Sequence, residues 1–347
     1  MPLSTINNTL PYVVSMGEPS GIGPEIILKS WMARRVSDLP VFFVTGQKNI
    51  FQETANALGL NVPLEVISSP DEAAKIFSKA LPIFDVGENT SFTLSRPSTA
   101  TASLTLGAIT TAVEFIFSQK TAGLITAPIQ KSVLYQAGFT CPGHTEYLAE
   151  LCLKHTAEFS LPIMMLVSEY LRVIPLTIHM PLRDVMAAIT PDLIVETCEK
   201  IHHSLIQDFG ISAPRIAVAG LNPHAGENET MGNEDSHIIA PALETLRQKG
   251  LDIQGPLPAD TMFHARAREK YDAALCMYHD QALIPIKTLD FDGGVNVTVG
   301  LPLVRTSPDH GTALNIAGQN KANPTSMINA IKRADQISQN RQAYSHV

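Results

Sequence analysis

The sequence is poor in charged residues and contains no cluster of basic ones. Of its 347 residues 17% are charged, and 25 Lys+Arg against 33 Asp+Glu give a formal net charge of −8. An acidic chain of this kind repels a phosphate backbone at long range, so binding to nucleic acid by bulk charge is excluded. Any anionic ligand must therefore meet positive charge that is gathered locally.

Long uninterrupted apolar runs are also missing. The longest apolar stretch, residues 161–182, is interrupted by Glu169 and Arg172 and contains several prolines, so we expect strands there and not a membrane-spanning helix. Residues 1–11 lack the basic start and apolar centre of a signal peptide. We therefore expect a cytoplasmic protein that does not bind a membrane.

Cysteine is scarce and scattered. Cys141, Cys152, Cys198 and Cys276 form no CxxC pair, which argues against a disulfide framework and against a thiolate metal site. We expect reduced and mostly buried thiols.

Short β-branched or apolar runs alternate with longer helical patterns, and this predicts an α/β protein with βαβ units and a largely parallel sheet. The length allows two domains or one large α/β unit. Candidate strands cover residues 12–15, 41–45, 123–126, 163–166, 173–178, 215–219 and 273–277. Candidate helices cover 24–34, 48–58, 104–117, 145–152, 191–208, 238–249 and 325–340. Residues 91–103 read as a surface loop and as a candidate domain crossing.

Three of the eleven histidines, His179, His224 and His279, follow the carboxyl ends of predicted strands. In open α/β sheets ligands bind at that edge. Three neutral imidazoles suit Zn²⁺ or another first-row divalent ion and leave coordination positions open for a substrate. Taken singly, each histidine is more often a hydrogen-bonded structural residue, so the shared placement is what favours a site.

Three short motifs could bind an anion at the same edge. In SMGEPSGIGPEI, glycines precede Pro24 at a predicted helix start, which is compatible with an anion site or with an ordinary tight turn. In TAPIQKS, Lys131 follows a predicted strand, where a lone lysine is usually solvated. In PGHTEYL, we predict Thr145 as a helix N-cap, with His144 exposed at the helix mouth and able to bind phosphate or move a proton.

The final third of the chain concentrates polar groups. Asp260 follows two prolines in a rigid turn, and Lys287, Asn296 and Arg305 follow at intervals of nine residues. Lysine and arginine supply the charge-assisted hydrogen bonds that a phosphate ester or carboxylate requires, although a solvated set of surface charges is the alternative. The long polar loop after Arg305 predicts a binding segment.

Together these segments resemble the 4-hydroxythreonine-4-phosphate dehydrogenase family of vitamin B6 biosynthesis. The resemblance is carried, in order between residues 17 and 324, by GEPSGIGPEI, TAPIQK, GHTEYL, GLNPHAGE, MYHDQALIPIK, GVNVTVGLPLVRTSPDHGTALNIAG and KANP. The loop at 309–324 is also similar to the adenine-side loop of isopropylmalate and isocitrate dehydrogenases, whose fold this family shares. Departures from the family pattern are Glu18, where aspartate is more frequent, and GQNKA at 318–322 in place of GRGKA.

The resemblance implies a fold, domains and site residues. It implies two α/β/α domains with largely parallel sheets and the active site in the cleft between them, one formed by residues 1–143 with 300–347 and the other by 144–299. The implied metal ligands are His179, His224 and His279, placed at a homodimer interface and shared between subunits. The implied substrate contacts are His144, Thr145, Lys287, Asn296 and Arg305; Asp260 matches an acidic active-site position, and His310, Gly311 and Asn323 would contact NAD or NADP.

The implied activity is a metal- and NAD(P)-dependent oxidation of 4-phosphooxy-L-threonine to the 3-oxo acid. Decarboxylation to 3-amino-2-oxopropyl phosphate would follow, as a step of pyridoxal 5′-phosphate biosynthesis. Asp260 and His144 are the candidate bases. Imidazole ligands favour Zn²⁺ or Co²⁺ over Mg²⁺ without excluding it.

Two kinds of alternative stay open. Within the dehydrogenases, relatives acting on D-threonate or D-erythronate 4-phosphate, or on a dihydrodiol, have similar sequences. Outside them, a phosphate acyltransferase-like enzyme without nicotinamide, or a binding protein without activity, could use a related fold.

Overall fold

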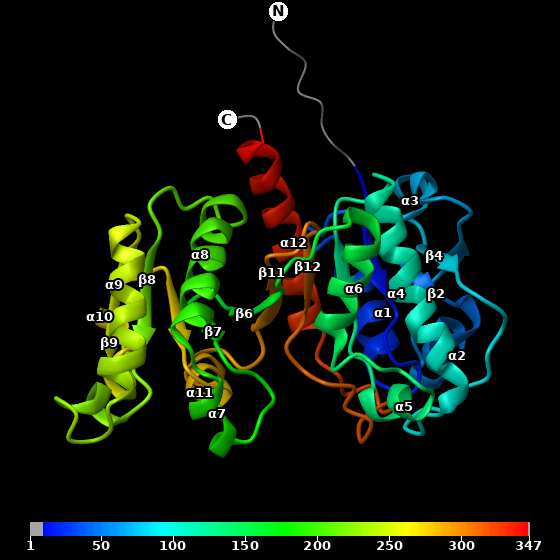
Figure 1. Ribbon diagram of the computed structural model, residues 1–347. Coiled ribbons are helices and arrows are strands. Elements are labelled where there is room, and N and C mark those ends of the chain that lie inside the picture. The colour runs from blue at the N-terminus through cyan, green and yellow to red at the C-terminus, as the bar shows by residue number, and fades with distance from the viewer. Residues whose placement is uncertain (1–9, 346–347) are drawn as a thin grey trace, which may run out of the picture. The chain divides into compact units, whose positions relative to one another are not determined.

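The computed structural model describes residues 10–345 (Figure 1). The chain divides into two compact units, each formed by two segments. Unit 1 contains residues 10–159 and Leu303–Asp335, and unit 2 contains Ser160–Pro302 and 336–345. Each unit contains six neighbouring strands with helices packed against them.

The sheet of unit 1 is entirely parallel, in the order β3, β4, β2, β1, β5, β12. Its central strands are short and fully buried, as expected for a parallel sheet with helices on both faces. The strands are β1 (Tyr12–Ser15), β2 (Phe42–Gly46), β3 (Leu64–Val66), β4 (Leu81–Asp85), β5 (Leu124–Thr126) and β12 (Arg305–Pro308).

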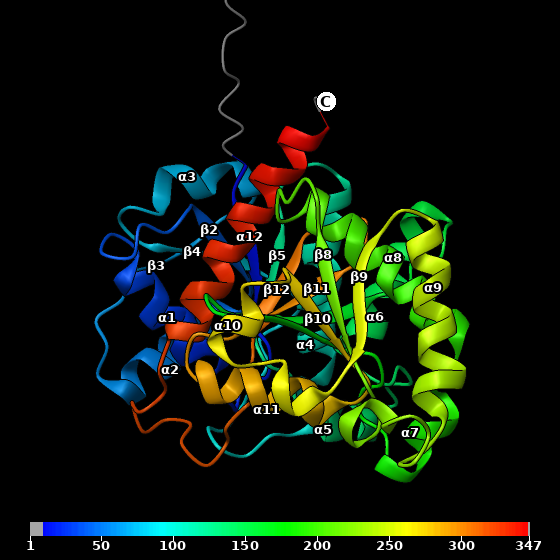
Figure 2. The same ribbon diagram turned by 90° about the vertical axis from the view of Figure 1, so that its left-hand side faces the viewer.

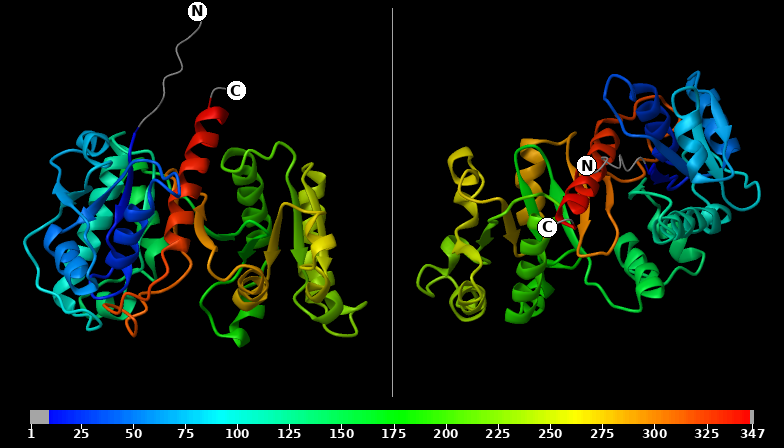
Figure 3. Two further views of the ribbon diagram at one scale, coloured as in Figure 1. Left: turned by 180° about the vertical axis from the view of Figure 1, so that it is seen from behind. Right: turned by 90° about the horizontal axis from the view of Figure 1, so that it is seen from above.

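Helices cover both faces of this sheet, with α4 and α6 together on one face and α1 on the other (Figure 3). Local signals set their ends: Pro24 occupies the first turn of α1, and Gly59 ends α2 with a left-handed φ of +65°. The helices are α1 (Gly23–Ala33), α2 (Lys48–Leu58), α3 (Ala73–Ile76), α4 (Ala102–Phe117), α5 (Lys131–Gln136) and α6 (His144–Thr156). α12 (Thr325–Tyr344) contributes residues to both units.

Unit 2 has a mixed sheet in the order β11, β6, β7, β10, β8, β9. β6 pairs antiparallel with both β11 and β7, and the remaining pairs are parallel. The strands are β6 (Ile163–Val167), β7 (Arg172–Pro175), β8 (Arg215–Ala219), β9 (Asp252–Leu257), β10 (Ala273–Cys276) and β11 (Val295–Val299).

In unit 2, α8 and α9 lie on one side of the strands and α10 and α11 on the other (Figure 2). Thr190 caps α8, because its side chain accepts a hydrogen bond from the Leu193 amide, and Pro191 takes the first helical position. The helices are α7 (Leu182–Ala188), α8 (Pro191–Gln207), α9 (Ala240–Gln248), α10 (Ala265–Arg268) and α11 (His279–Leu289). Buried side chains from β6, β7, β8, β10 and α11 form a continuous core.

The α/β class and the alternation of strands and helices are confirmed, while several expected boundaries are wrong. The stretch 161–182 contains the strands β6 and β7, but β7 ends at Pro175 and not at residue 178. The loop at 91–103 lies wholly inside unit 1 and is no domain crossing, and its last residues already form the start of a helix. The chain leaves unit 1 after Phe159, whereas the predicted boundary lies at residue 143.

Among residues 10–345, one helical segment, Thr99–Phe117, is long and apolar enough to pass a length-and-composition test for a membrane span. Its main part, α4, packs against β1, β2 and β5 of unit 1. It therefore serves as a core helix of the unit, and its hydropathy is explained by that packing.

Candidate functional site

Arg305 begins β12 in unit 1, and its guanidinium is almost completely buried, with 4% of the residue exposed. Its Nη2 and Nε donate hydrogen bonds to Thr126 Oγ1 at 2.7 and 3.2 Å, across the parallel pair of β12 and β5. Burial lowers the pKa of Arg305 to about 10, while the nearby Glu146 carboxylate opposes this shift. Arg305 therefore stays cationic at neutral pH, at the end of β5.

His144 is the first residue of α6, and Gly143 is its N-cap. The prediction of Thr145 as N-cap is therefore wrong, because the helix starts one residue earlier and no side chain caps it. The expected exposure of His144 is wrong as well: the residue is half-buried, and its Nε2 is buried without a hydrogen-bond partner among the described residues. Burial, and then the charges of Arg305 and Lys131, hold the pKa of His144 well below its usual value. His144 is thus a neutral imidazole at neutral pH.

Lys131 begins α5 close to the same helix end. A Cβ built at Gly143 would lie 3.0 Å from Lys131 Nζ and 2.7 Å from Glu146 Oε2, so both side chains reach the N-cap of α6. Lys131 is therefore not a lone lysine: it is half-buried and lies beside the start of α6. Lys131, His144, Glu146 and Arg305 form one cluster, to which we refer as the α6 cluster.

The polar loop at 309–324 also belongs to unit 1. His310 Nδ1 lies 3.1 Å from the Gly311 carbonyl oxygen, and no hydrogen-bond partner of its buried Nε2 is found in the described part of the chain. The Cβ position of Gly311 has no atom within 4 Å. Asn323 Oδ1 accepts hydrogen bonds from the amide and hydroxyl of Thr325, at 3.0 and 2.7 Å, and so orders the start of α12.

Helix α1 anchors the end of this loop. Glu25 Oε1, on a residue with 1% exposed surface, accepts hydrogen bonds from Lys29 Nζ at 2.7 Å and from the Ala322 amide at 3.0 Å. Lys29 Nζ also donates to the Ala322 carbonyl at 2.8 Å. The GPEI and KANP motifs are thus connected through a buried ion pair, a relation that their separation in the sequence hides.

In unit 2, the structure brings two of the three strand-end histidines together. The ring centroids of His179 and His279 lie 5.6 Å apart, and His279 Nδ1 is 3.4 Å from Asp280 Oδ2. His224 is exposed in a short turn, Pro223–Gly226, and has a φ of +53°. Within residues 10–345 of one chain, no group of three or more His, Cys, Asp or Glu side chains could hold a metal ion. The described part of a single chain therefore does not bring all three histidines together.

Two polar residues that the sequence reasoning missed, one buried and one half-buried, hold the histidine-bearing loops of unit 2. Asp235, 1% exposed, accepts hydrogen bonds from the Leu221 and Asn222 amides at 2.8 and 3.1 Å and so holds the turn before His224. Gln281 accepts from the Met277 amide at 2.7 Å and donates to the Gly220 carbonyl at 2.8 Å. It therefore joins the ends of β10 and β8, and its place in the motif MYHDQ was the available signal.

The remaining predicted residues are spread over unit 2. Lys287 lies on α11, with its Nζ 5.7 Å from the Phe291 ring centroid. Asn296 lies on β11, and its Oδ1 is buried with no hydrogen-bond partner among the residues described. Asp260 lies in the exposed turn Ala259–Thr261.

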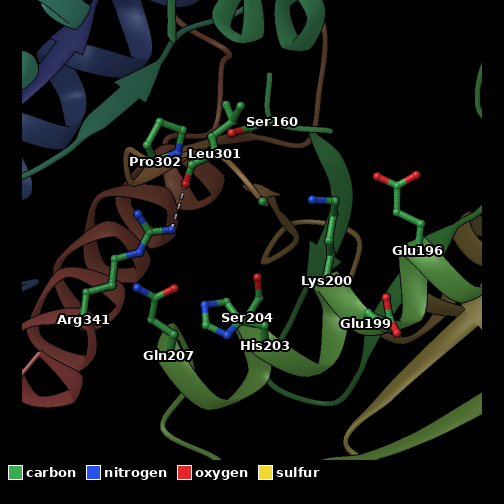
Figure 4. A pocket seen from close by; sticks show the side chains of 11 residues that line it. Ser160, Glu196, Glu199, Lys200, His203, Ser204, Gln207, Leu301, Pro302 and Arg341 are labelled. Carbon is green, nitrogen blue, oxygen red and sulfur yellow. Dashed lines mark hydrogen bonds between the residues drawn. The ribbon is translucent and has the colours of Figure 1, made fainter. Parts of the chain in front are cut away.

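Unit 2 also contains a pocket of about 460 Å³ beside α8 (Figure 4). Polar side chains from α8, such as Lys200 and Ser204, line it together with Arg341 of α12 and residues 300–302. None of the predicted site residues lines this pocket.

The family model of the pyridoxal phosphate biosynthetic protein PdxA matches residues 38–334. This chain belongs to the PdxA family. A relative from Bradyrhizobium diazoefficiens named 4-hydroxythreonine-4-phosphate dehydrogenase is 49% identical over 335 residues, covering 94% of this chain and 96% of the relative. A relative of the same name from Maricaulis maris is 50% identical over 335 residues, covering 95% and 98% of the two chains.

The PdxA assignment extends to the three-dimensional structure. The crystal structure of 4-hydroxythreonine-4-phosphate dehydrogenase from Klebsiella pneumoniae matches this chain with a TM-score of 0.82 at 36% identity. The match covers 94% of this chain and 99% of the other. The PdxA family resemblance expected from the motifs is thus confirmed over nearly the full length.

Proposed function

We propose that this chain is a 4-hydroxythreonine-4-phosphate dehydrogenase, an oxidoreductase that acts on a CH–OH group in pyridoxine and pyridoxal 5′-phosphate biosynthesis. The observation that carries the proposal is the identity of about half of all residues with relatives of that name over nearly the full chain. The substrate is a small phosphorylated hydroxy acid, 4-phosphooxy-L-threonine. The product is the 3-oxo acid, which loses carbon dioxide to give 3-amino-2-oxopropyl phosphate.

The proposal assigns substrate contacts to His144, Thr145 and Arg305 of unit 1 and to Lys287 and Asn296 of unit 2. Arg305 is suited to this role because its guanidinium is held rigidly by Thr126 and stays charged despite its burial. Asn296 offers a buried amide oxygen without a protein partner in the described residues, as a substrate-orienting group would.

Of the two candidate bases, His144 is the one with a buried nitrogen that lacks a partner in the described residues. It is neutral at neutral pH, and its buried Nε2 has no hydrogen-bond partner in the part of the chain described, so it can accept a hydrogen bond or a proton from a bound hydroxyl group. Asp260 is exposed to solvent and offers no comparable arrangement.

A divalent metal fits the donors that unit 2 presents. The His179 and His279 rings, with centroids 5.6 Å apart, are close enough for one nitrogen of each to bind the same ion. We propose that His224 of a second subunit completes the set in a homodimer. A divalent ion, when bound, supplies positive charge that makes a neighbouring hydroxyl group more acidic. Imidazole ligands favour Zn²⁺ or Co²⁺ over Mg²⁺.

The nicotinamide cofactor, NAD or NADP, supplies the hydride acceptor when bound. We assign His310, Gly311 and Asn323 to its binding, because the loop that carries them is anchored by Glu25 and Lys29 and is open at Gly311. We propose that the enzyme works in the cytoplasm, as expected of a metabolic dehydrogenase like its relatives.

A substrate panel tests the proposal. The metal-loaded protein is incubated with NAD or NADP and with 4-phosphooxy-L-threonine, and reduced nicotinamide is followed by its absorbance. D-erythronate 4-phosphate and D-threonate 4-phosphate serve as the matched alternatives without an amine. We expect kcat/KM to be at least about tenfold higher for the amine-bearing substrate, the factor that one lost charge-assisted hydrogen bond would cost. Faster turnover of a hydroxyl analogue, or no reduction with any substrate, would refute the proposed function.

A further inference from the structure

We propose that Lys131 binds an oxyanion of the substrate, together with Arg305 and the amino end of α6. This inference names a further binding residue for the activity proposed above and rests on it in that respect. All residues of the anion site lie in unit 1, and anion binding to it can be measured without following catalysis.

Lys131, the first residue of α5, lies beside the start of α6. Lys131 Nζ lies 3.0 Å from the Cβ position of Gly143, so its ammonium group stands against the N-cap of α6. Any side chain at residue 143 would displace either Lys131 or Glu146. Glycine at this N-cap thus leaves room for the ammonium group beside the helix end.

The Lys131 ammonium group and the first amide groups of α6 are hydrogen-bond donors that a ligand could engage. No hydrogen bond or ion pair engages Lys131 within residues 10–345, although it is half-buried. No side chain caps α6, so the first amide groups of this thirteen-residue helix are available to a ligand. His144 Nε2 is buried without a partner in the described chain, and the charges of Arg305 and Lys131 both act on its ring.

The α6 cluster carries a net positive charge. Lys131 and Arg305 contribute two positive charges and Glu146 one negative charge, while His144 is neutral, which leaves a net charge of +1. The positive end of the helix dipole adds to this. An oxyanion matches such a site, since ammonium, guanidinium and backbone N–H groups are all donors. The substrate has two such groups, a phosphate and a carboxylate.

Direct binding of small anions tests the site. Inorganic phosphate and, separately, L-threonine are titrated into the metal-loaded protein, and binding is measured by calorimetry. We compare the wild type with Lys131→Met, with Lys131→Arg, and with Lys332→Met as a control at an exposed lysine of α12. We expect Lys131→Met to weaken the binding of one of the two probes at least tenfold, Lys131→Arg to retain part of it, and the control to match the wild type. The affected probe identifies phosphate or carboxylate as the bound group.

Steady-state kinetics provide the second readout. Lys131→Met is expected to raise KM for the phosphorylated substrate by at least tenfold with a smaller effect on kcat, because a binding group is lost. Gly143→Ala should act in the same direction while leaving every charge in place. Unchanged binding of both probes in Lys131→Met, in a variant that unfolds at the wild-type temperature, would overturn the inference. If the anion binding depends on Lys131 but no dehydrogenase activity is found, the inference stands and the proposed function falls.

Discussion

A neutral histidine that is kept from protonating makes the folded protein sensitive to acid. Burial and two neighbouring cations depress the pKa of His144 in the folded state. Below about pH 6.5 the unfolded chain takes up a proton at this residue while the folded chain does not, so the free energy of unfolding falls as the pH falls. We predict that His144→Gln loses less stability than the wild type between about pH 8 and about pH 5.5.

Urea unfolding at the two pH values measures this difference. A single histidine contributes at most about 1.4 kcal/mol per pH unit. His237→Gln, at an exposed histidine, controls for the substitution itself. Equal acid sensitivity of wild type and His144→Gln would show that His144 takes up a proton normally in the folded state.

The buried guanidinium of Arg305 is predicted to require its forked shape and not only its charge. A lysine in its place would keep a cation but lose the paired donation to Thr126 and the fixed plane. We expect Arg305→Lys to lower kcat/KM by about 100-fold, the loss of one or two charge-assisted hydrogen bonds. Thr126→Val, which removes only the acceptor, should cost less; an unaffected Arg305→Lys enzyme would exclude Arg305 from the site.

Sequence reasoning identified the site residues by type and motif but not their surroundings. It placed His144 and Arg305 among the candidates, yet it described His144 as exposed and Lys131 as solvated. The surroundings of both depend on side chains of α5, α6 and β12, and β12 lies far from the two helices in the chain. One sequence without such contacts cannot distinguish a solvated lysine from one held against a helix end.

Helix α1 holds the end of the polar loop at 309–324 in place. Glu25 and Lys29 on α1 hold Ala322 in the polar loop through a buried ion pair. We predict that Glu25→Gln raises KM for the nicotinamide cofactor by about tenfold, because the weakened acceptor loosens the loop, while kcat changes less. Lys75→Met, at an exposed lysine of α3, is the control. Cofactor titrations monitored by initial rates check this, and an unchanged KM would separate the loop from cofactor binding.

A second buried ion pair joins α8 to α12 in unit 2. Arg341 Nε lies 2.6 Å from Asp208 Oδ1, and Asp208 is 2% exposed. We predict that Arg341→Met lowers the free energy of unfolding by about 3 kcal/mol or more, since it leaves a carboxylate buried without its partner. The double variant with Asp208→Asn should recover part of the loss.

Arg183→Met is the matched control, because the ion pair of Arg183 with Asp184 is exposed on both sides. It should change stability by less than about 1 kcal/mol. Denaturant unfolding of the three variants measures these effects. Similar losses for Arg341→Met and Arg183→Met would contradict the role of burial.

Periodicity was a good guide to the long helices and to the most apolar strands, and a poor one to strands that contain polar residues, Gly or Pro. The buried runs of β1 and β8 and the amphipathic α2 and α8 were found nearly to the residue, because apolar residues repeat at the period of the element. Five strands were missed: β3, β4, β9, β11 and β12. β3 has only three residues, and each of the others contains Gly, Pro, Asn, Asp or Arg, which weakens an apolar pattern. Exact helix starts such as that of α6 depend on local backbone geometry that composition does not specify.

At the scale of the whole molecule, we propose that His179, His224 and His279 bind one metal ion between two subunits. One described chain brings His179 and His279 together and leaves His224 exposed in a separate turn, so we propose that a second subunit supplies the third imidazole. Such a site makes the monomer incomplete. A homodimer would supply the missing ligand by symmetry, twice over.

Subunit mixing tests this claim most directly. His179→Ala and His224→Ala are each expected to lose the metal and the activity. When the two inactive variants are unfolded, mixed in equal amounts and refolded together, half of the dimers are mixed and each of these has one complete site. We predict that about a quarter of the wild-type activity and of the bound metal returns. Persistent inactivity of a properly folded mixed dimer, or full metal content in either variant alone, would contradict the shared site.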